Sequence, residues 1–212
     1  MMKDNAVFAA AMAATSLVAL ASPATANEPD LRPLNGFYAG VFAGAIALDS
    51  TVSFAATDTR PAERYVDQGG DGFVVGLRGG WGQLISVHKY LGIEIEGLVP
   101  WNVTSRLNAN GAEYRARLRS ELGIYGRAGW SRDGQDLLFI RAGFTIPKQT
   151  YESVENHGTG TADWTPVPTI GAGAEIAISR RWAGRVDISY SFPHGDNVLE
   201  SYRLTFGVSY RF

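Results

Sequence analysis

Apolar and polar residues alternate one by one along most of this chain. The carboxyl end, "YRLTFGVSYRF", carries an apolar or aromatic residue at every second position from Tyr202 to Phe212, with polar or small residues between them. A period of two predicts β-strands whose two faces meet different surroundings. The same alternation recurs at 36–47, 73–82, 90–101, 114–130, 137–147, 166–178 and 182–192. Together with the last segment, these predict an all-β fold of eight strands.

The connections between these segments alternate in length. Short ones lie at 83–89, 131–136 and 179–181, whereas long, polar, glycine-rich ones lie at 48–72, 102–113, 148–165 and 193–200. This order predicts an antiparallel up-and-down meander with its tight turns at one end and its long loops at the other. No linker or change of composition divides 36–212, so we expect one barrel domain there, preceded by a short segment at 27–35.

Two arrangements of such strands compete. In a soluble barrel or sandwich the apolar face forms the core, whereas in a membrane barrel the apolar face meets lipid and the polar face lines the lumen. The polar face here consists of glycines and isolated charged residues, with arginine in place of lysine. Arginine suits enclosed ion pairs because its planar guanidinium matches a carboxylate. We therefore predict a lumen charge network of Arg78, Glu94, Glu96, Arg117, Arg119, Glu121, Arg127, Arg141, Glu175, Arg185, Asp187, Arg203 and Arg211.

Aromatic residues gather near both ends of the expected strands. Transmembrane barrels carry aromatic girdles at the two membrane interfaces, and a soluble core has no reason to sort tryptophan in this way. The sequence thus predicts an eight-stranded antiparallel transmembrane β-barrel. We expect its girdles to include Trp81, Trp101, Trp130, Trp182, Tyr190 and Tyr202.

The first 26 residues have the pattern of a secretory signal peptide. A short region with Lys3 precedes an uncharged, alanine-rich apolar run, and small residues follow at 24–26. These three parts in this order predict export and removal of the segment. An uncleaved N-terminal anchor is the alternative interpretation.

Several stretches resemble the small OmpA-like outer-membrane β-barrel (porin-family) proteins of Gram-negative bacteria. They are "NGFYAGVFAG", "RARLRSELGIYGRAGW", "TIGAGAEIAISRRWAGRVDISYSF" and the last strand with its terminal phenylalanine. The resemblance implies location in the cell outer membrane. It also implies contact with outer-membrane lipid and lipopolysaccharide, and an assembly signal at Tyr210 and Phe212 that the barrel assembly machinery reads.

Little in the sequence indicates reaction chemistry. There is no cysteine, the three histidines are far apart, and the formal net charge of −2 lacks the basic excess that nucleic-acid binding needs. We therefore expect no catalytic residue, metal, cofactor or nucleic-acid partner. His194-Gly195-Asp196-Asn197 resembles the His-x-Ser-Asn motif of lipid A deacylases, but aspartate replaces the nucleophilic serine.

The expected role is structural, in envelope integrity and surface presentation, without an open wide pore. An eight-stranded barrel is narrow enough for its own side chains to fill. Three alternatives remain: a narrow porin-like channel for small solutes, a surface-loop adhesin or binding protein, and a lipid A-modifying hydrolase. An external ligand would bind through loops 48–72 and 148–165, because loops on a rigid scaffold often carry binding sites.

Overall fold

The computed structural model describes residues 34–50, 52–54, 63–65, 70–101, 103–109, 112–153, 159–161, 166–192 and 199–212. These residues form strands and tight turns. Within them, no helix is long and apolar enough to cross a membrane. The predicted signal peptide, at 1–26, lies outside the described residues.

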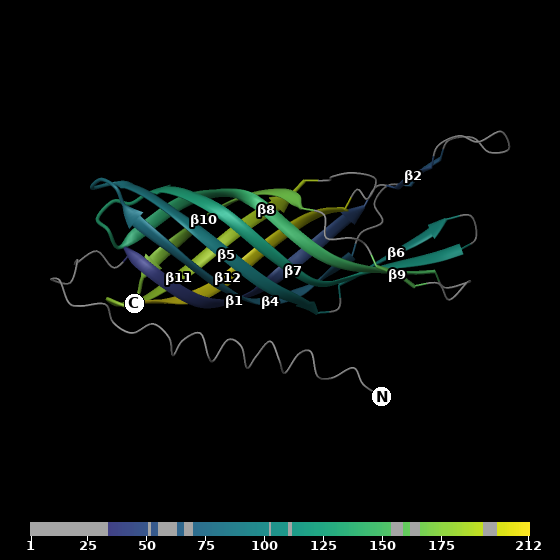
Figure 1. The fold of residues 1–212 in the computed structure, drawn as a ribbon, viewed down its shortest axis with the longest axis horizontal. Coiled ribbons are helices and arrows are strands. Elements are labelled where there is room, and N and C mark those ends of the chain that lie inside the picture. Colours follow the sequence, from purple (N-terminus) through teal and green to yellow (C-terminus); the bar gives the residue numbers. More distant parts are fainter. Residues whose placement is uncertain are drawn as a thin grey trace, which may run out of the picture.

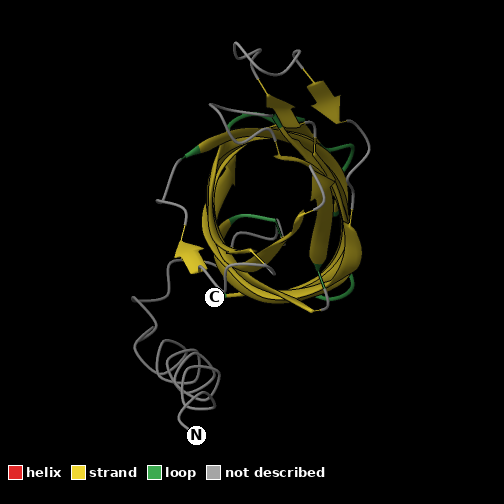
Figure 2. Ribbon diagram, turned by 90° about the vertical axis from the view of Figure 1, so that its right-hand side faces the viewer, coloured by secondary structure: helices red, strands yellow, loops and turns green. Residues whose placement is uncertain are grey.

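Eight long strands close into one antiparallel barrel (Figures 1 and 2). Each strand pairs with the next along the chain, and the first pairs with the last, which confirms the predicted up-and-down barrel. The barrel strands are β1 (Gly36–Ser50), β4 (Gly70–Leu84), β5 (Lys89–Trp101), β7 (Ala112–Trp130), β8 (Asp136–Ser153), β10 (Val167–Ala177), β11 (Trp182–Ser191) and β12 (Leu199–Arg211).

The short connections and the carboxyl terminus lie together at one end of the barrel, which we call the turn end (Figure 1). The turn between β7 and β8 shows how the sequence specifies a tight reversal. Gly134 has a φ of 82°, a value that glycine adopts without strain. The hydroxyl of Ser131 accepts a hydrogen bond from the Gly134 amide at 2.8 Å, and the Asp133 carboxylate accepts one from Gln135 at 2.9 Å. These bonds satisfy backbone groups that a turn leaves unpaired.

The opposite end, which we call the loop end, contains more strand than the pattern predicted. Part of the expected loop 102–113 is β6 (Thr104–Ala109), which pairs with the start of β7. Part of the expected loop 148–165 belongs to β8 and to β9 (Thr159–Thr161). β2 (Val52–Phe54) and β3 (Glu63–Tyr65) form a separate hairpin within 48–72. Ladder pairing therefore continues beyond the barrel, where the alternation of apolar residues fades.

The apolar face of the strands points outward. On β5, for example, Leu91, Ile93 and Ile95 are exposed, whereas Glu94 and Glu96, at the alternate positions, are buried. A water-exposed surface with this much contiguous apolar area would be unusual, and it suits contact with lipid. The predicted orientation, with the polar face inward, is thus confirmed.

Candidate functional site

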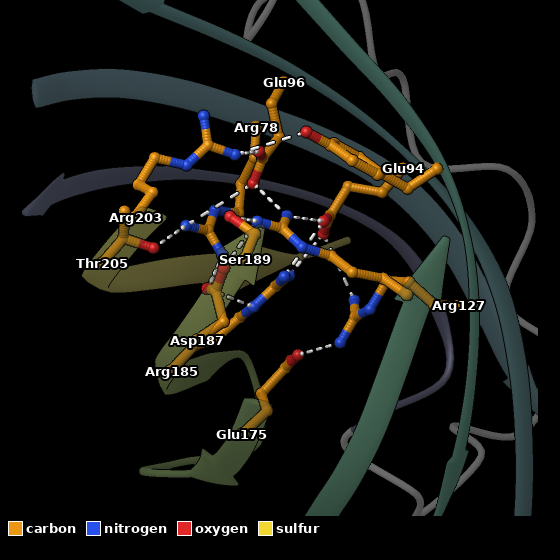
Figure 3. Close-up of polar contacts among 12 residues, drawn as sticks. Arg78, Glu94, Glu96, Arg127, Glu175, Arg185, Asp187, Ser189, Arg203 and Thr205 are labelled. Carbon is orange, nitrogen blue, oxygen red and sulfur yellow. Dashed lines mark hydrogen bonds and ion pairs between the residues drawn. The ribbon is translucent and has the colours of Figure 1, made fainter. Parts of the chain in front are cut away.

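The lumen of the barrel is the largest concentration of charged side chains in the described residues. Its buried charges are six arginines and five carboxylates, which leaves a net charge of +1. The charged side chains labelled in Figure 3 converge from opposite walls of the barrel. The buried charged residues are Arg78, Arg127, Arg141, Arg185, Arg203 and Arg211, with Glu94, Glu96, Glu121, Glu175 and Asp187.

Glu94, on β5, is the centre of this network. Both of its oxygens accept hydrogen bonds from Arg185 on β11, across the lumen, and the Arg185 Nη2–Glu94 Oε1 bond measures 3.0 Å. Arg127 and Arg141 also donate to it, at 3.4 and 3.2 Å, and the Tyr38 hydroxyl donates at 2.6 Å. Three guanidinium groups and a phenol hydroxyl therefore surround this one carboxylate. Glu96 and Asp187 each also contact three guanidinium groups, without a phenol donor among the described contacts.

A second layer of ion pairs joins the remaining walls. Glu96 accepts hydrogen bonds from Arg141 at 2.6 Å and from Arg203 at 2.9 Å. Asp187 lies 3.0 Å from a guanidinium nitrogen of Arg78 and 2.8 Å from one of Arg141. Since Arg78, Arg141 and Arg203 each contact carboxylates from two different strands, the network links the walls of the barrel through its centre.

The network ends in simpler pairs toward each end of the lumen. On one side, Glu121 pairs with Arg203 at 2.8 Å. On the other, Glu175 pairs with Arg127 at 2.8 Å and with Arg211 at 2.6 Å. Arg211 also donates to the backbone carbonyl of Leu34, so the last strand holds the segment that precedes β1.

Aromatic rings fill the space beside the guanidinium groups. The Phe139 ring lies 4.2 Å from the guanidinium carbon of Arg127 and 4.4 Å from that of Arg185. Arg78 lies 4.4 Å above the Phe42 ring. Such stacking is attractive, and it excludes water from around the charges.

Apolar side chains cover the network at both ends. Phe42, Ile46, Leu48, Val74, Leu98, Val103 and Leu118 form one buried cluster toward the loop end. Leu34, Leu84, Tyr90, Leu137 and Phe139 form another toward the turn end. The sequence pattern placed Phe42 on the inner face but gave no sign that apolar groups would close the lumen. On β8, β10 and β11, the hydroxyls of Thr145, Thr169 and Ser191 form a chain with distances of 3.1 and 2.9 Å.

Two of the predicted network residues do not face the lumen. Arg117 and Arg119 are exposed, whereas Leu118 between them is buried. The register of β7 against β8 shifts between Leu118 and Ser120, as in a β-bulge. One extra residue in the strand reverses the inward and outward positions that follow it. The prediction for Arg117 and Arg119 is therefore wrong. It extended the alternation seen at Glu121 back toward the start of the strand, and that alternation does not reveal a bulge.

The expected girdle residues lie on the outer face of the barrel. Trp81, Trp130 and Trp182 are exposed near the turn end, and Trp101 and Tyr202 are exposed near the loop end. Tyr190 is half-buried, with its ring 4.8 Å from those of Phe192 and Tyr202. At the carboxyl end, Tyr210 and Phe212 stack edge to face, with ring centroids 5.3 Å apart.

Other candidate residues lie outside the described part of the chain. These are His157, His194 with the motif that follows it, and most of the loop residues between 51 and 69. Among the residues that are described, no group of three or more histidines and acids could hold a metal ion.

The comparisons with known proteins agree with this architecture. A family model described as outer membrane protein beta-barrel domain matches residues 10–212. No curated protein matches the sequence. The solved structure of Neisserial surface protein A is similar, with a TM-score of 0.56 and 10% identity over 84% of this chain and 98% of that chain.

Two further barrels are similar at lower scores. Ail, the attachment invasion locus protein of Yersinia pestis, has a TM-score of 0.43 and 11% identity, covering 84% of this chain and 99% of its own. The N-terminal β-barrel domain of Pseudomonas aeruginosa OprF has a TM-score of 0.42 and 10% identity, covering 80% of this chain and 97% of that chain. At 10% identity, the likeness to Neisserial surface protein A shows the fold alone.

Proposed function

The chain belongs to the outer membrane protein β-barrel family and lies in the cell outer membrane, where we propose that it is a structural barrel. In this role it contributes to envelope integrity and presents its loops at the cell surface. It does not act as an enzyme or as a wide pore.

The closed lumen carries this proposal. Each buried carboxylate of the network has at least one arginine within 3.0 Å, and both ends are covered by apolar clusters. A water-filled channel would leave charged groups solvated, whereas these are paired with one another, as burial requires. An eight-stranded interior filled by its own side chains also matches what this barrel size allows.

The alternatives have less support. A narrow channel would need a continuous polar path past Phe42 and Leu98, which belong to the apolar cluster at the loop end. A hydrolase would use His194, and an adhesin would use the loops at 48–72 and 148–165. The structure does not describe most of the side chains at these positions, so we do not propose either function.

Membership of this family also suggests how the barrel is exported and assembled. We propose that 1–26 is removed during export, and that the barrel assembly machinery reads Tyr210 and Phe212. The backbone amide of Phe212 donates a hydrogen bond to the carbonyl of Phe37 at 3.1 Å. The residue that would serve as the signal therefore also closes the barrel between β12 and β1.

Deleting the gene distinguishes the structural role from a role in transport. In a strain that lacks the gene, one would measure leakage of a periplasmic enzyme and uptake of a small hydrophilic solute. The structural role predicts increased leakage with unchanged solute uptake, both restored by the wild-type gene. Reduced uptake without leakage would instead favour the channel and refute the structural proposal.

A further inference from the structure

Three basic side chains form a patch on the outer wall of the barrel at the loop end. Arg117 and Arg119 project from β7, and Lys148 projects from β8 beside them, where Ser120 pairs with Lys148 and Arg117 with Thr150. We call Arg117, Arg119 and Lys148 the rim patch. Both arginines point outward because of the β-bulge. Without the extra residue, the alternation would place Arg117 and Arg119 on the inner face of the barrel.

The rim patch lies at the edge of the apolar band. On β8 the outward positions run from Leu138 through Ile146, and the next outward residue is Lys148, ten residues beyond Leu138. At about 3.3 Å per residue along a strand tilted by about 45°, this corresponds to a height of roughly 23 Å. The apolar band of such barrels is about 25 Å tall. Lys148 therefore lies at the level of the outer-leaflet headgroups.

Charge around the loop end is unevenly distributed among the described residues. Among the described residues near the loop end, the charged outward positions on other strands are acidic, with Asp71 on β4, two strands from β7, and Glu200 on β12, across the barrel from β7. Within the described part of the chain, no carboxylate pairs with any side chain of the rim patch. Three exposed cations are thus gathered on one side, where they would together attract an external anion.

We propose that the rim patch binds the phosphate groups of a phosphorylated outer-leaflet lipid of the lipid A type. Arginine donates two parallel hydrogen bonds to a phosphate, and lysine adds a point charge. The acyl chains of that lipid would lie along the exposed wall below, which includes Leu122. Trp101, which is 74% exposed at the end of the neighbouring strand β5, would contact the headgroup region. This inference rests on the outer-membrane location and goes beyond the structural role.

The test uses the full mature barrel in detergent, with native mass spectrometry to count bound lipid A. In the variant with Arg117→Gln, Arg119→Gln and Lys148→Gln, we expect the affinity for bisphosphorylated lipid A to fall roughly fivefold per charge, on the order of a hundredfold in total. A matched variant with Lys89→Gln, Arg132→Gln and Arg180→Gln removes three exposed charges from the turn end. It should bind within about twofold of wild type, because those positions lie far from the outer leaflet.

Two further probes identify the source of the phosphate. Dephosphorylated lipid A should bind the wild-type barrel as weakly as the rim-patch variant binds lipid A, and millimolar inorganic phosphate should not displace lipid A. Equal binding by the rim-patch variant, equal loss in the turn-end variant, or displacement by inorganic phosphate would each overturn the proposal. Gel mobility before and after boiling shows that each variant is folded.

If the triple variant fails to fold, a single substitution outside the β-bulge provides the test. Lys148→Glu lies on β8 and should weaken lipid A binding more than fivefold, while Asp71→Asn on the acidic side should not weaken it. These outcomes are independent of envelope leakage, so failure here would leave the structural role standing.

Discussion

Neutralising Glu94 should destabilise the barrel more than neutralising a lumen carboxylate that has a single arginine partner. The substitution Glu94→Gln keeps the shape of the side chain but removes the charge that Arg127, Arg141 and Arg185 share. The net charge of the described lumen residues would rise from +1 to +2. Removing one partner of a buried ion pair typically costs about 3–5 kcal/mol, and we expect a loss in that range.

Glu121→Gln is the matched control. Glu121 is also buried, but it pairs with a single arginine, Arg203, which keeps its second contact with Glu96. We therefore expect its neutralisation to cost about 1–3 kcal/mol. Both carboxylates are buried, so the difference between the two losses in unfolding free energy reports the number of guanidinium groups around each carboxylate.

The assay is urea-induced unfolding of the barrel refolded into phospholipid bilayers, followed by tryptophan fluorescence. The free energy of unfolding comes from the transition midpoint at a constant m-value. A double variant, Glu94→Gln with Arg185→Met, removes one charge of each sign. Its loss should be smaller than the sum of the two single losses by about 0.5–3 kcal/mol. If Glu94→Gln were no more destabilising than Glu121→Gln, the idea of a tightly coupled, dehydrated network would be refuted.

Three further predictions concern the wall and the end of the chain. Deleting Phe212 should lower the amount of barrel in outer-membrane fractions on an immunoblot, and unchanged amounts would rule out an assembly signal there. Gly76→Ala should reduce the free energy of unfolding, because a Cβ would lie 2.5 Å from the Gly97 carbonyl and against the Phe42 ring; a neutral result in urea unfolding would contradict the close packing. Ile95→Arg, at a 61% exposed position in the middle of the band, should cost about 2–4 kcal/mol, whereas Ile178→Arg, 66% exposed at the turn end, should cost about 0–1 kcal/mol. Equal costs in the same assay would argue against lipid contact.

The sequence predicted the faces of the strands well where the alternation is unbroken. On β5, Glu94 and Glu96 lie inward as expected, because nothing interrupts the period of two between Tyr90 and Trp101. On β7 the same reading failed at Arg117 and Arg119. The bulge at Leu118–Ser120 contains no glycine or proline that would have marked it.

The partners within the lumen could not be predicted from the sequence. Glu94 and Arg185 are 91 residues apart, and their contact depends on the width of the closed barrel and on the register of every strand between them. The apolar clusters were also missed, because Ile46 and Val74 follow the polar parity of their strands but are themselves apolar. A pattern of alternation shows which face a residue occupies, but not what lies across the lumen.

Ion conductance in a planar lipid bilayer tests the closed lumen most directly. The purified, folded barrel would be inserted and recorded under applied voltage, with a general porin as the positive control. Our account predicts no conductance steps from the wild-type barrel, because the paired charges and the two apolar clusters fill the lumen. Stable, reproducible conductance steps from the wild-type barrel would contradict it and favour a narrow channel.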